Sequence, residues 1–174
     1  MSEPPIRYAA LPSPVGPLYA AAGPHGLLRL HFGRGTRLSA FARSLPGPST
    51  HVEPSDDPTL APLAEELEHY FAGEPDPFTV HLDLQAGTPF RKRVWRTLRR
   101  IPFGHTVAYG GLARRVGAPQ GARAVGQAVG ANPIAIVVPC HRVIRASGEL
   151  GGFGGGLPIK RWLLSHEAAL PTPC

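Results

Sequence analysis

Apolar residues in this 174-residue chain recur at two kinds of spacing, and these spacings restrict the folds open to it. In the first part, Ser-Pro, Gly-Pro and His-Gly turn signals separate short apolar runs at residues 6–11, 17–22 and 26–32. Runs of this length between such dipeptides predict strands of an antiparallel meander. A later segment, Leu60 to Phe71, instead places apolar residues three and four positions apart, which predicts a helix.

The segments around that helix are expected to complete a small lobe. Residues 44–58 hold four prolines among polar neighbours and predict a surface loop. Pro75 and Pro77 end the helix, and residues 78–84 predict one more strand. We therefore expect residues 1–83 to form an N-terminal antiparallel-sheet α/β lobe. This lobe is expected to be a scaffold, because it contains no pattern typical of catalysis.

The second half, residues 84–174, predicts a mainly α lobe. Thr88-Pro89 is a helix start, since a capping residue precedes a proline in the first turn. Further helices are expected at residues 109–116, 122–129 and 158–168. The first two are short and joined by the tight turn Gly117–Gln120, which predicts a helix-turn-helix in a winged-helix-like lobe.

Charged residues are sorted between the two halves. Residues 1–87 carry five arginines against ten carboxylates, whereas residues 88–174 carry thirteen lysines and arginines against two carboxylates. Such asymmetry favours an oriented encounter with a polyanion, most often nucleic acid. The helix after Thr88 carries six of these cations, including the candidate phosphate ligands Arg91 and Arg96. An arginine-rich composition that clusters without a binding role remains the alternative.

Small residues dominate the second helix of the predicted helix-turn-helix. Arg123 is its one charged residue, and Ala122, Ala124 and Gly126 surround it. Small side chains let a backbone approach a surface closely, so these residues are candidates to lie against DNA. Close packing of this helix against another explains the same pattern equally well. The pattern alone leaves both interpretations open.

The pentapeptide Pro139-Cys140-His141-Arg142-Val143 carries the clearest chemical signal. A thiolate is the nucleophilic form of cysteine, and a neighbouring imidazole lowers the pKa of a thiol towards working pH. For a Cys-His pair by itself, the alternative is a buried cysteine that only fills space. Residues 148–156 contain six glycines and predict a flexible linker or a binding-site loop. Their position between this motif and the closing helix favours the loop.

Several classes of protein are disfavoured by the sequence. No apolar run reaches membrane-spanning length and the first residues lack a secretory signal pattern, so a cytoplasmic protein with no membrane partner is expected. The two cysteines, Cys140 and Cys174, are expected to stay reduced there. No Cys and His residues have zinc-ligand spacing, so neither a metal nor a cofactor is expected.

Taken together, the motifs between about residues 86 and 168 resemble those of the O6-alkylguanine-DNA alkyltransferases, also called methylated-DNA–protein-cysteine methyltransferases. The matching elements are Phe90-x3-Val94-Trp95-x2-Leu98, Ile101-Pro102-x-Gly104, Tyr109, Arg123-Ala124-Val125-Gly126, Asn132-Pro133, Pro139-Cys140-His141-Arg142-Val143 and Lys160-x-Trp162-Leu163-Leu164-x2-Glu167. This set is highly specific, although no single element is. The N-terminal lobe resembles the family only in length and in its order of strands followed by helix.

The resemblance implies direct, stoichiometric DNA repair without a cofactor. Cys140 would accept the alkyl group from O6-alkylguanine, with O4-alkylthymine as a second candidate substrate. His141 and Glu167 would activate the thiol, as the base and its orienting partner do in hydrolase triads. Asn132 would hold the turn that leads to the cysteine.

The resemblance also implies how DNA is bound. The target base would leave the stack, as base-modifying enzymes require. Arg123 would fill the gap it leaves, and Tyr109 would help rotate the nucleotide and donate to the guanine ring. The helix-turn-helix would occupy the minor groove of double-stranded DNA, and the protein would act as a monomer. The base pocket would comprise Val138, Phe153, Gly154 and Gly155.

Phe153-Gly154 departs from the family pattern. Members often carry a tyrosine followed by a serine or a bulkier residue at this place. The pocket should therefore be more open and make fewer hydrogen bonds to O6 of the base, so bulky adducts such as benzyl are expected to be accepted. Zinc ligands are also missing, as in metal-free members of the family.

Three other functions fit part of the pattern. A protein that recognises alkylated guanine without transfer would lack the reactive cysteine, whereas this chain has Cys140. A helix-turn-helix transcription regulator would need base-reading side chains, which residues 121–131 barely offer. A cysteine hydrolase would explain Cys140, His141 and Glu167 but not the basic half.

Overall fold

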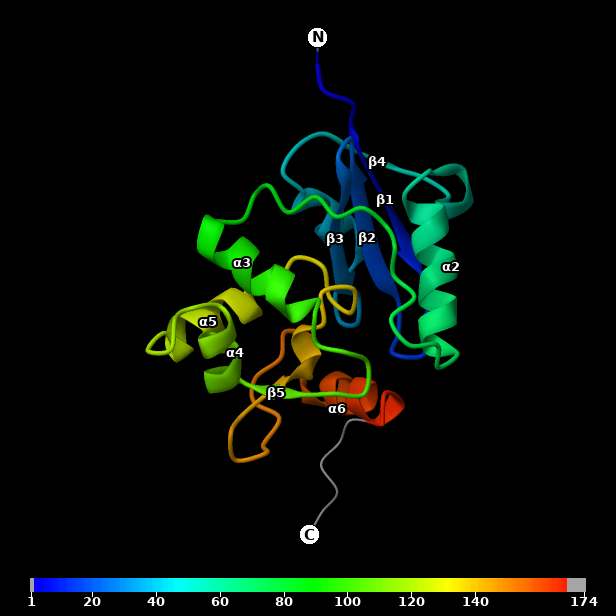
Figure 1. Cartoon of the computed structure of the whole chain (residues 1–174). Helices are drawn as coiled ribbons and strands as arrows, with labels where there is room; N and C mark the ends of the chain where they lie inside the picture. The colour runs from blue at the N-terminus through cyan, green and yellow to red at the C-terminus, as the bar shows by residue number, and fades with distance from the viewer. Residues whose placement is uncertain (1, 169–174) are drawn as a thin grey trace. The chain divides into compact units, whose positions relative to one another are not determined.

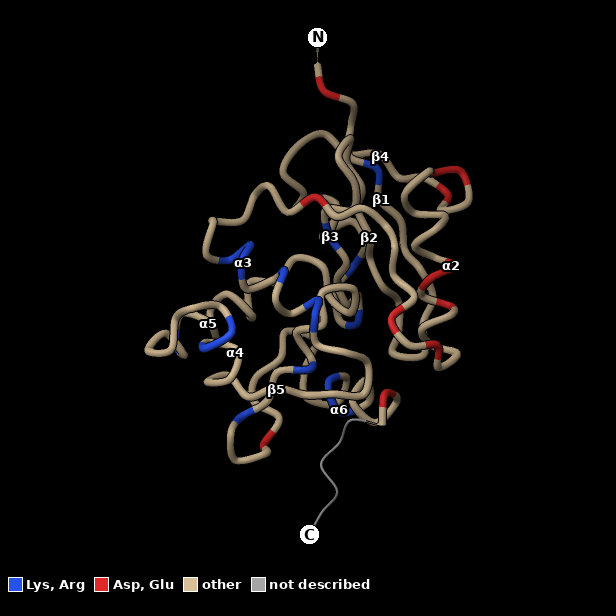
Figure 2. Tube along the Cα trace, in the orientation of Figure 1, with Lys and Arg blue, Asp and Glu red and all other residues tan. Residues whose placement is uncertain are grey.

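The chain separates into two compact units, Met1–Leu84 and Gln85–Cys174 (Figure 1). This computed structural model describes residues 2–168, so Cys174 lies outside the described part. Figure 2 shows the sorting of charge, with Asp and Glu along α2 (Leu60–Phe71) and Lys and Arg along α3 (Pro89–Leu98). Among the described helices, none has the length and hydropathy needed to cross a bilayer.

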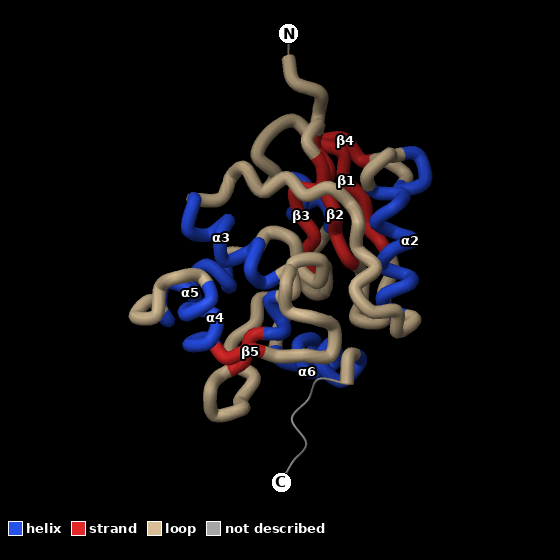
Figure 3. The backbone as a smooth tube through the Cα atoms, viewed as in Figure 1, coloured by secondary structure: helices blue, strands red, loops and turns tan. Residues whose placement is uncertain are grey.

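The first unit contains a four-stranded sheet with the order β3-β2-β1-β4 (Figure 3). Its strands are β1 (Ile6–Leu11), β2 (Leu18–Gly23), β3 (Gly26–Phe32) and β4 (Ser49–His51). The first three pair antiparallel, which confirms the predicted meander. The prediction that residues 44–58 are loop alone is wrong, because β4 pairs in parallel with β1 and the 3-10 helix η1 (Pro54–Asp56) follows it.

Two α-helices pack on this sheet. The helix α2 (Leu60–Phe71) has the predicted bounds, buries Leu63, Leu67 and Tyr70, and contacts β2. The helix α1 (Leu38–Arg43) was not predicted, and its Phe41 joins Tyr19 in a buried cluster. Apolar burial on these helices supports the sheet.

Residues 78–84 do not form the predicted strand. Only Leu82 bridges to Leu27 of β3. The backbone N–H groups of Thr79 and Val80 instead donate to the carboxylate of Glu66 on α2, at 2.8 and 3.4 Å. Since these donors are satisfied by a helix side chain, the segment does not continue a strand ladder.

The second unit is mainly helical. Its helices are α3 (Pro89–Leu98), α4 (Tyr109–Arg115), α5 (Ala122–Gly130) and α6 (Leu157–His166), with a 3-10 turn η2 (Cys140–Arg142). Two short strands, β5 (Val107–Ala108) and β6 (Val143–Ile144), pair in parallel. These elements confirm the helices predicted at residues 109–116, 122–129 and 158–168 within one or two residues at each end. The helix α3 ends at Leu98, so Arg99 and Arg100, which were predicted to belong to it, lie in the turn that follows.

The turn between α4 and α5 has a local chemical cause. Gly117 has a φ of 77°, which favours glycine, and Ala118 N–H donates to Ala113 O at 2.9 Å across it. This hydrogen bond closes α4 and redirects the chain into α5. The predicted helix-turn-helix is therefore present.

The buried face of α3 packs against α5. Thr88 caps α3 by accepting from Arg91 N–H at 3.2 Å. On its buried face Trp95 donates through Nε1 to Ala128 O of α5 at 2.8 Å. Arg91 and Arg96 are exposed. The packing fixes α5 while leaving the charged face of α3 in solvent.

Candidate active site

A short loop carries the chain from the end of α5 to Cys140. Asn132 spans it, since its Oδ1 accepts from Ile134 N–H at 3.0 Å and its Nδ2 donates to Val138 O at 2.7 Å. Two tight turns lie between these contacts, with Val137 N–H bonded to Ala135 O and Cys140 N–H bonded to Val138 O, both at 2.8 Å. One amide side chain thus holds both ends of the loop.

The backbone of this loop is strained at one residue. Ile136 has a φ of 69°, a region that β-branched residues rarely adopt. Such a residue costs on the order of 1–3 kcal/mol and persists only where its surroundings fix it. The bonds of Asn132 and the complete burial of Ile134 and Val138 supply that constraint.

Cys140 begins η2 and is 8% exposed. Burial raises the pKa of its thiol, while the Asn132 amide, the charge of Lys160 and the N–H groups of Cys140 and His141 act in the opposite direction. The expectation that the imidazole brings the thiol pKa down towards working pH is therefore wrong for the protein without DNA. The thiol rests in its protonated form and needs a base.

His141 is fully buried, and only one of its two ring nitrogens has a hydrogen-bond partner. Its Nε2 lies 2.7 Å from Oε1 of Glu167, and its Nδ1 has no hydrogen-bond partner. An ionised carboxylate only accepts, so the proton of the neutral imidazole is on Nε2 and Nδ1 keeps a free lone pair. Burial lowers the pKa of His141 despite the opposing effect of Glu167, which keeps the ring neutral and able to accept a proton.

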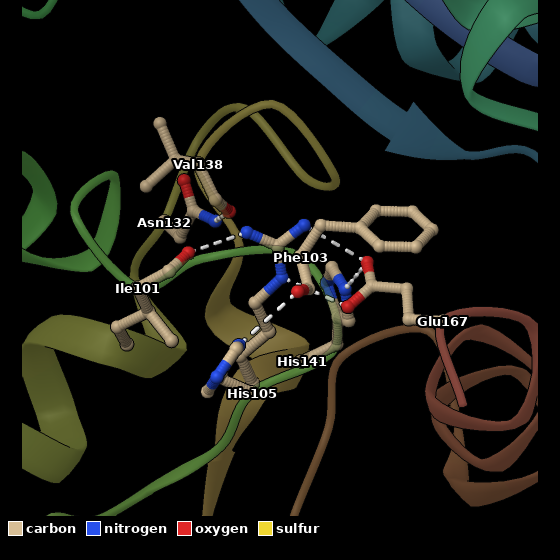
Figure 4. A network of polar contacts seen from close by, with 8 residues as sticks. Ile101, Phe103, His105, Asn132, Val138, His141 and Glu167 are labelled. Atoms are coloured by element: carbon tan, nitrogen blue, oxygen red, sulfur yellow. Dashed lines mark hydrogen bonds and ion pairs between the residues drawn. The ribbon is translucent and has the colours of Figure 1, made fainter. Parts of the chain in front are cut away.

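Glu167 follows α6 and is 3% exposed, yet it stays ionised. Burial would raise its pKa, but hydrogen bonds and charge from His141 and Arg142 outweigh that effect and lower the pKa to about 2. Arg142 donates to it through Nε at 2.9 Å and Nη2 at 3.0 Å. Arg142 also donates through Nη1 to Ile101 O at 2.6 Å. Figure 4 shows Ile101, His141 and Glu167 of this network.

Lys160 is the second buried cation of the site. Its Nζ donates to Val143 O at 2.7 Å, to Gly152 O at 3.4 Å and to Leu150 O. It therefore ties β6 to the start of the glycine-rich segment. Burial lowers its pKa to about 8, and a thiolate at Cys140 would raise that value. The ring centroid of Phe153 lies 6.0 Å from the same ammonium group.

Tyr109 brings the helix-turn-helix next to the nucleophile. A Cβ added to Gly126 of α5 would lie 4.0 Å from its ring, and one added to Gly151 would lie 3.4 Å from its hydroxyl. Burial raises the pKa of Tyr109, and the charge of a Cys140 thiolate raises it further. The phenol thus stands between α5, the glycine-rich segment and Cys140.

The structure brings most of the predicted site residues together, but not all of them. Cys140, His141 and Glu167 are all buried, His141 contacts Glu167 at 2.7 Å, and the Asn132 amide acts on Cys140. The predicted DNA-binding residues of α5 are Ala122, Arg123 and Ala124, which are exposed, and Gly126, which is half-buried. Arg91 and Arg96 lie apart from the cluster on α3. Of the predicted pocket residues, Val138 is buried, Phe153 and Gly155 are half-buried and Gly154 is exposed.

The sequence motifs contain Arg142 and Lys160, but no role in the site was predicted for either residue. The signal that could have identified them is their neighbours, since Arg142 precedes Val143-Ile144 and Lys160 follows Ile159. A charge inside a buried apolar stretch requires a partner. In residues 2–168, no group of three or more His, Cys, Asp or Glu side chains is placed to hold a metal ion.

The arrangement is suited to one nucleophilic displacement. It provides a buried thiol, a neutral imidazole with a free lone pair, and a carboxylate that fixes the imidazole tautomer. A substrate carbon would have to enter beside Tyr109 and the glycine-rich segment.

Comparison with known proteins agrees with this chemistry. Residues 89–169 match the family model described as the DNA-binding domain of 6-O-methylguanine DNA methyltransferase, and residues 6–84 match its ribonuclease-like domain. This chain belongs to the 6-O-methylguanine DNA methyltransferase family. The two family domains meet between residues 84 and 89, close to the boundary between the compact units.

Relatives from bacteria and archaea match nearly the whole chain. The methylated-DNA–protein-cysteine methyltransferase of Mycobacterium tuberculosis is 47% identical over 93% of this chain and 92% of its own. That of Methanosarcina acetivorans is 42% identical over 94% of this chain and 99% of its own. The crystal structure of M. tuberculosis OGT in complex with DNA has a TM-score of 0.78 at 45% identity, covering 94% of this chain and 93% of that one.

The glycine-rich segment carries the predicted departure from the pattern of the 6-O-methylguanine DNA methyltransferase family. Phe153 offers an aromatic face but no hydroxyl, and an added Cβ at Gly154 would meet no atom within 4 Å. The side of the site formed by this segment is therefore apolar and open.

Proposed function

We propose that this protein repairs O6-alkylguanine in DNA by moving the alkyl group to Cys140, once per molecule. One observation carries the proposal: His141, next to the buried thiol, is bound to Glu167 through Nε2 and has a partnerless Nδ1. A related protein of the same family has been crystallised with DNA, which supports DNA as the partner. The fold does not by itself specify the reaction.

The reaction begins with removal of the thiol proton. His141 Nδ1 takes it from Cys140, through a bridging water, and Glu167 stabilises the imidazolium. The thiolate then attacks the alkyl carbon in line, so that a sulfur–carbon bond forms and the carbon–O6 bond breaks. The released electron pair passes to O6 and into the guanine ring, which takes up one proton supplied by Tyr109. The product is guanine and a thioether, and nothing in the site removes the thioether.

The substrate base must leave the duplex to reach a thiol that is 8% exposed. Arg123, exposed on α5, fills the space in the stack, while Ala122, Ala124 and Gly126 let the helix approach the minor groove. Tyr109 guides the rotated nucleotide. Arg91 and Arg96 add phosphate contacts from α3, so affinity falls steeply with salt.

The two units divide the work in this proposal. The second unit binds DNA and transfers the alkyl group, and the first is its scaffold. The protein acts as a monomer on double-stranded DNA, without metal or cofactor. Because its substrate is DNA and the relatives named above come from bacteria and archaea, which have no nucleus, we place it in the cytoplasm.

Intact mass after mixing with a duplex containing one O6-methylguanine tests the proposal. A single methyl-for-hydrogen gain, mapped to Cys140, with guanine restored in the DNA, is the expected result. Cys174→Ser should behave as the unsubstituted protein, and Cys140→Ser should bind DNA without any gain. Tight binding of the unsubstituted protein to the lesion without a mass change would instead make it a recognition protein.

A further inference from the structure

The two-stranded ladder places an unassigned arginine beside Tyr109. In the parallel pair β5–β6, Ala108 lies opposite Ile144. The next residue on each strand is Tyr109 and Arg145, respectively. Parallel strands end at the same edge, so these two residues leave the ladder side by side.

Contacts with the glycine-rich segment place the same two side chains together. A Cβ built on Gly151 would lie 3.4 Å from Tyr109 Oη and 3.6 Å from Arg145 Cγ. Gly151 has a φ of 74°, which favours glycine. The charge of Arg145 also acts on the phenol, since it lowers the pKa of Tyr109 against the effect of burial. Arg145 therefore lies beside Tyr109, where a substrate would approach Cys140.

Arg145 is held by a carboxylate at that entrance. Its Nη1 lies 3.2 Å from Oε2 of Glu149, and the two side chains are 62% and 69% exposed. A turn closed by Arg145 N–H donating to Glu149 O at 2.9 Å keeps the pair adjacent. Between residues 85 and 168 the only other carboxylate side chain is Glu167, which is buried. The basic unit thus exposes a single carboxylate, and it lies against this arginine.

We propose that Arg145 binds a phosphate of the damaged strand and that Glu149 competes with this phosphate for the guanidinium. The inference rests on the proposed function and adds a contact to it. A guanidinium binds a phosphate or a carboxylate in the same forked geometry, so one anion excludes the other. An exposed ion pair is weak enough to be exchanged for a phosphate when DNA arrives.

A double-mutant cycle tests the competition. Arg145→Gln, Glu149→Gln and the double variant are compared with the unsubstituted protein for binding of a short, undamaged duplex at several salt concentrations. Arg161→Gln is the control for loss of one exposed positive charge, from α6 of the same unit. Each variant is also assayed with the free base O6-benzylguanine, which has no phosphate, and checked by thermal unfolding.

The expected results differ between the variants. Arg145→Gln should weaken binding and reduce the slope of log affinity against log salt by about one, the effect of one phosphate contact. Glu149→Gln should tighten binding roughly two- to fivefold, and this gain should disappear when residue 145 is already glutamine. Reaction with the free base should change less than binding of the duplex, because the free base has no phosphate for Arg145 to contact.

Two outcomes would overturn the proposal. If Arg145→Gln has the same affinity and salt slope as Arg161→Gln, Arg145 contacts no phosphate. An equal gain from Glu149→Gln in both backgrounds would mean that the carboxylate acts on DNA directly and not through Arg145. Failure of the proposed function would be seen separately, as no alkyl gain on Cys140 of the unsubstituted protein.

Discussion

Replacing Glu167 with glutamine should destabilise the second unit by about 3–5 kcal/mol, the usual cost of removing one partner from a buried ion pair. The carboxylate accepts hydrogen bonds from His141 Nε2 at 2.7 Å, Arg142 Nε at 2.9 Å and Arg142 Nη2 at 3.0 Å. A glutamine keeps one acceptor oxygen and turns an NH2 group towards these donors. Arg142, 2% exposed, would then keep its charge and lose the carboxylate of Glu167 as a counter-ion.

Urea unfolding followed by tryptophan fluorescence measures this unit selectively, because both tryptophans, Trp95 and Trp162, belong to it. Glu149→Gln is the matched control, since it is the same substitution at an exposed carboxylate and should change the free energy of unfolding by less than about 0.5 kcal/mol. A loss for Glu167→Gln no larger than for this control would refute the reasoning. Adding Arg142→Met to Glu167→Gln should cost less than the sum of the two single changes.

Three further outcomes are expected. The pKa of Glu167 is about 2 in the folded protein, below its ordinary value of 4.5. The contribution of Glu167 to stability is therefore complete above about pH 4.5 and is lost as the pH falls towards 2. In a plot of the urea midpoint against pH, Glu167→Gln should flatten this part of the curve. His141→Ala should slow single-turnover methyl transfer by about 10²- to 10⁴-fold, because it removes the base, and an unchanged rate would contradict that role. O6-benzylguanine should inactivate the protein, and Gly154→Trp should slow this inactivation more than it slows methyl transfer; a methyl-competent protein that resists benzylguanine would exclude the open pocket.

Sequence patterns predicted the elements whose cause is local. The helix α2 has an apolar face every turn, and α3 begins at the Thr88 cap, so their positions follow from spacing and capping. The strand β4 was missed because its pairing with β1 joins segments far apart in the sequence. Residues 78–84 resemble a strand in composition, and only the position of the Glu66 carboxylate, which takes two of their N–H groups, explains why they are not one.

The candidate site followed from motifs, but its electrostatics did not. The sequence indicates that Cys140, His141 and Glu167 act together, and the structure adds the 2.7 Å contact between His141 and Glu167. Burial raises the pKa of Cys140, an effect of the whole surrounding core that no neighbour in the sequence indicates. Likewise, the bidentate hold of Arg142 on Glu167 requires that α6 and η2 meet, which is a property of the tertiary fold.

The buried, protonated state of Cys140 has a consequence for a protein that reacts once. Oxidants and soluble electrophiles attack exposed thiolates, so a thiol that is 8% exposed and has a raised pKa escapes them. Each molecule has one reactive cysteine, so oxidation or alkylation of that cysteine before DNA is bound would leave the molecule unable to repair a lesion. Burial therefore keeps the Cys140 thiol unmodified until an extruded base reaches the sulfur.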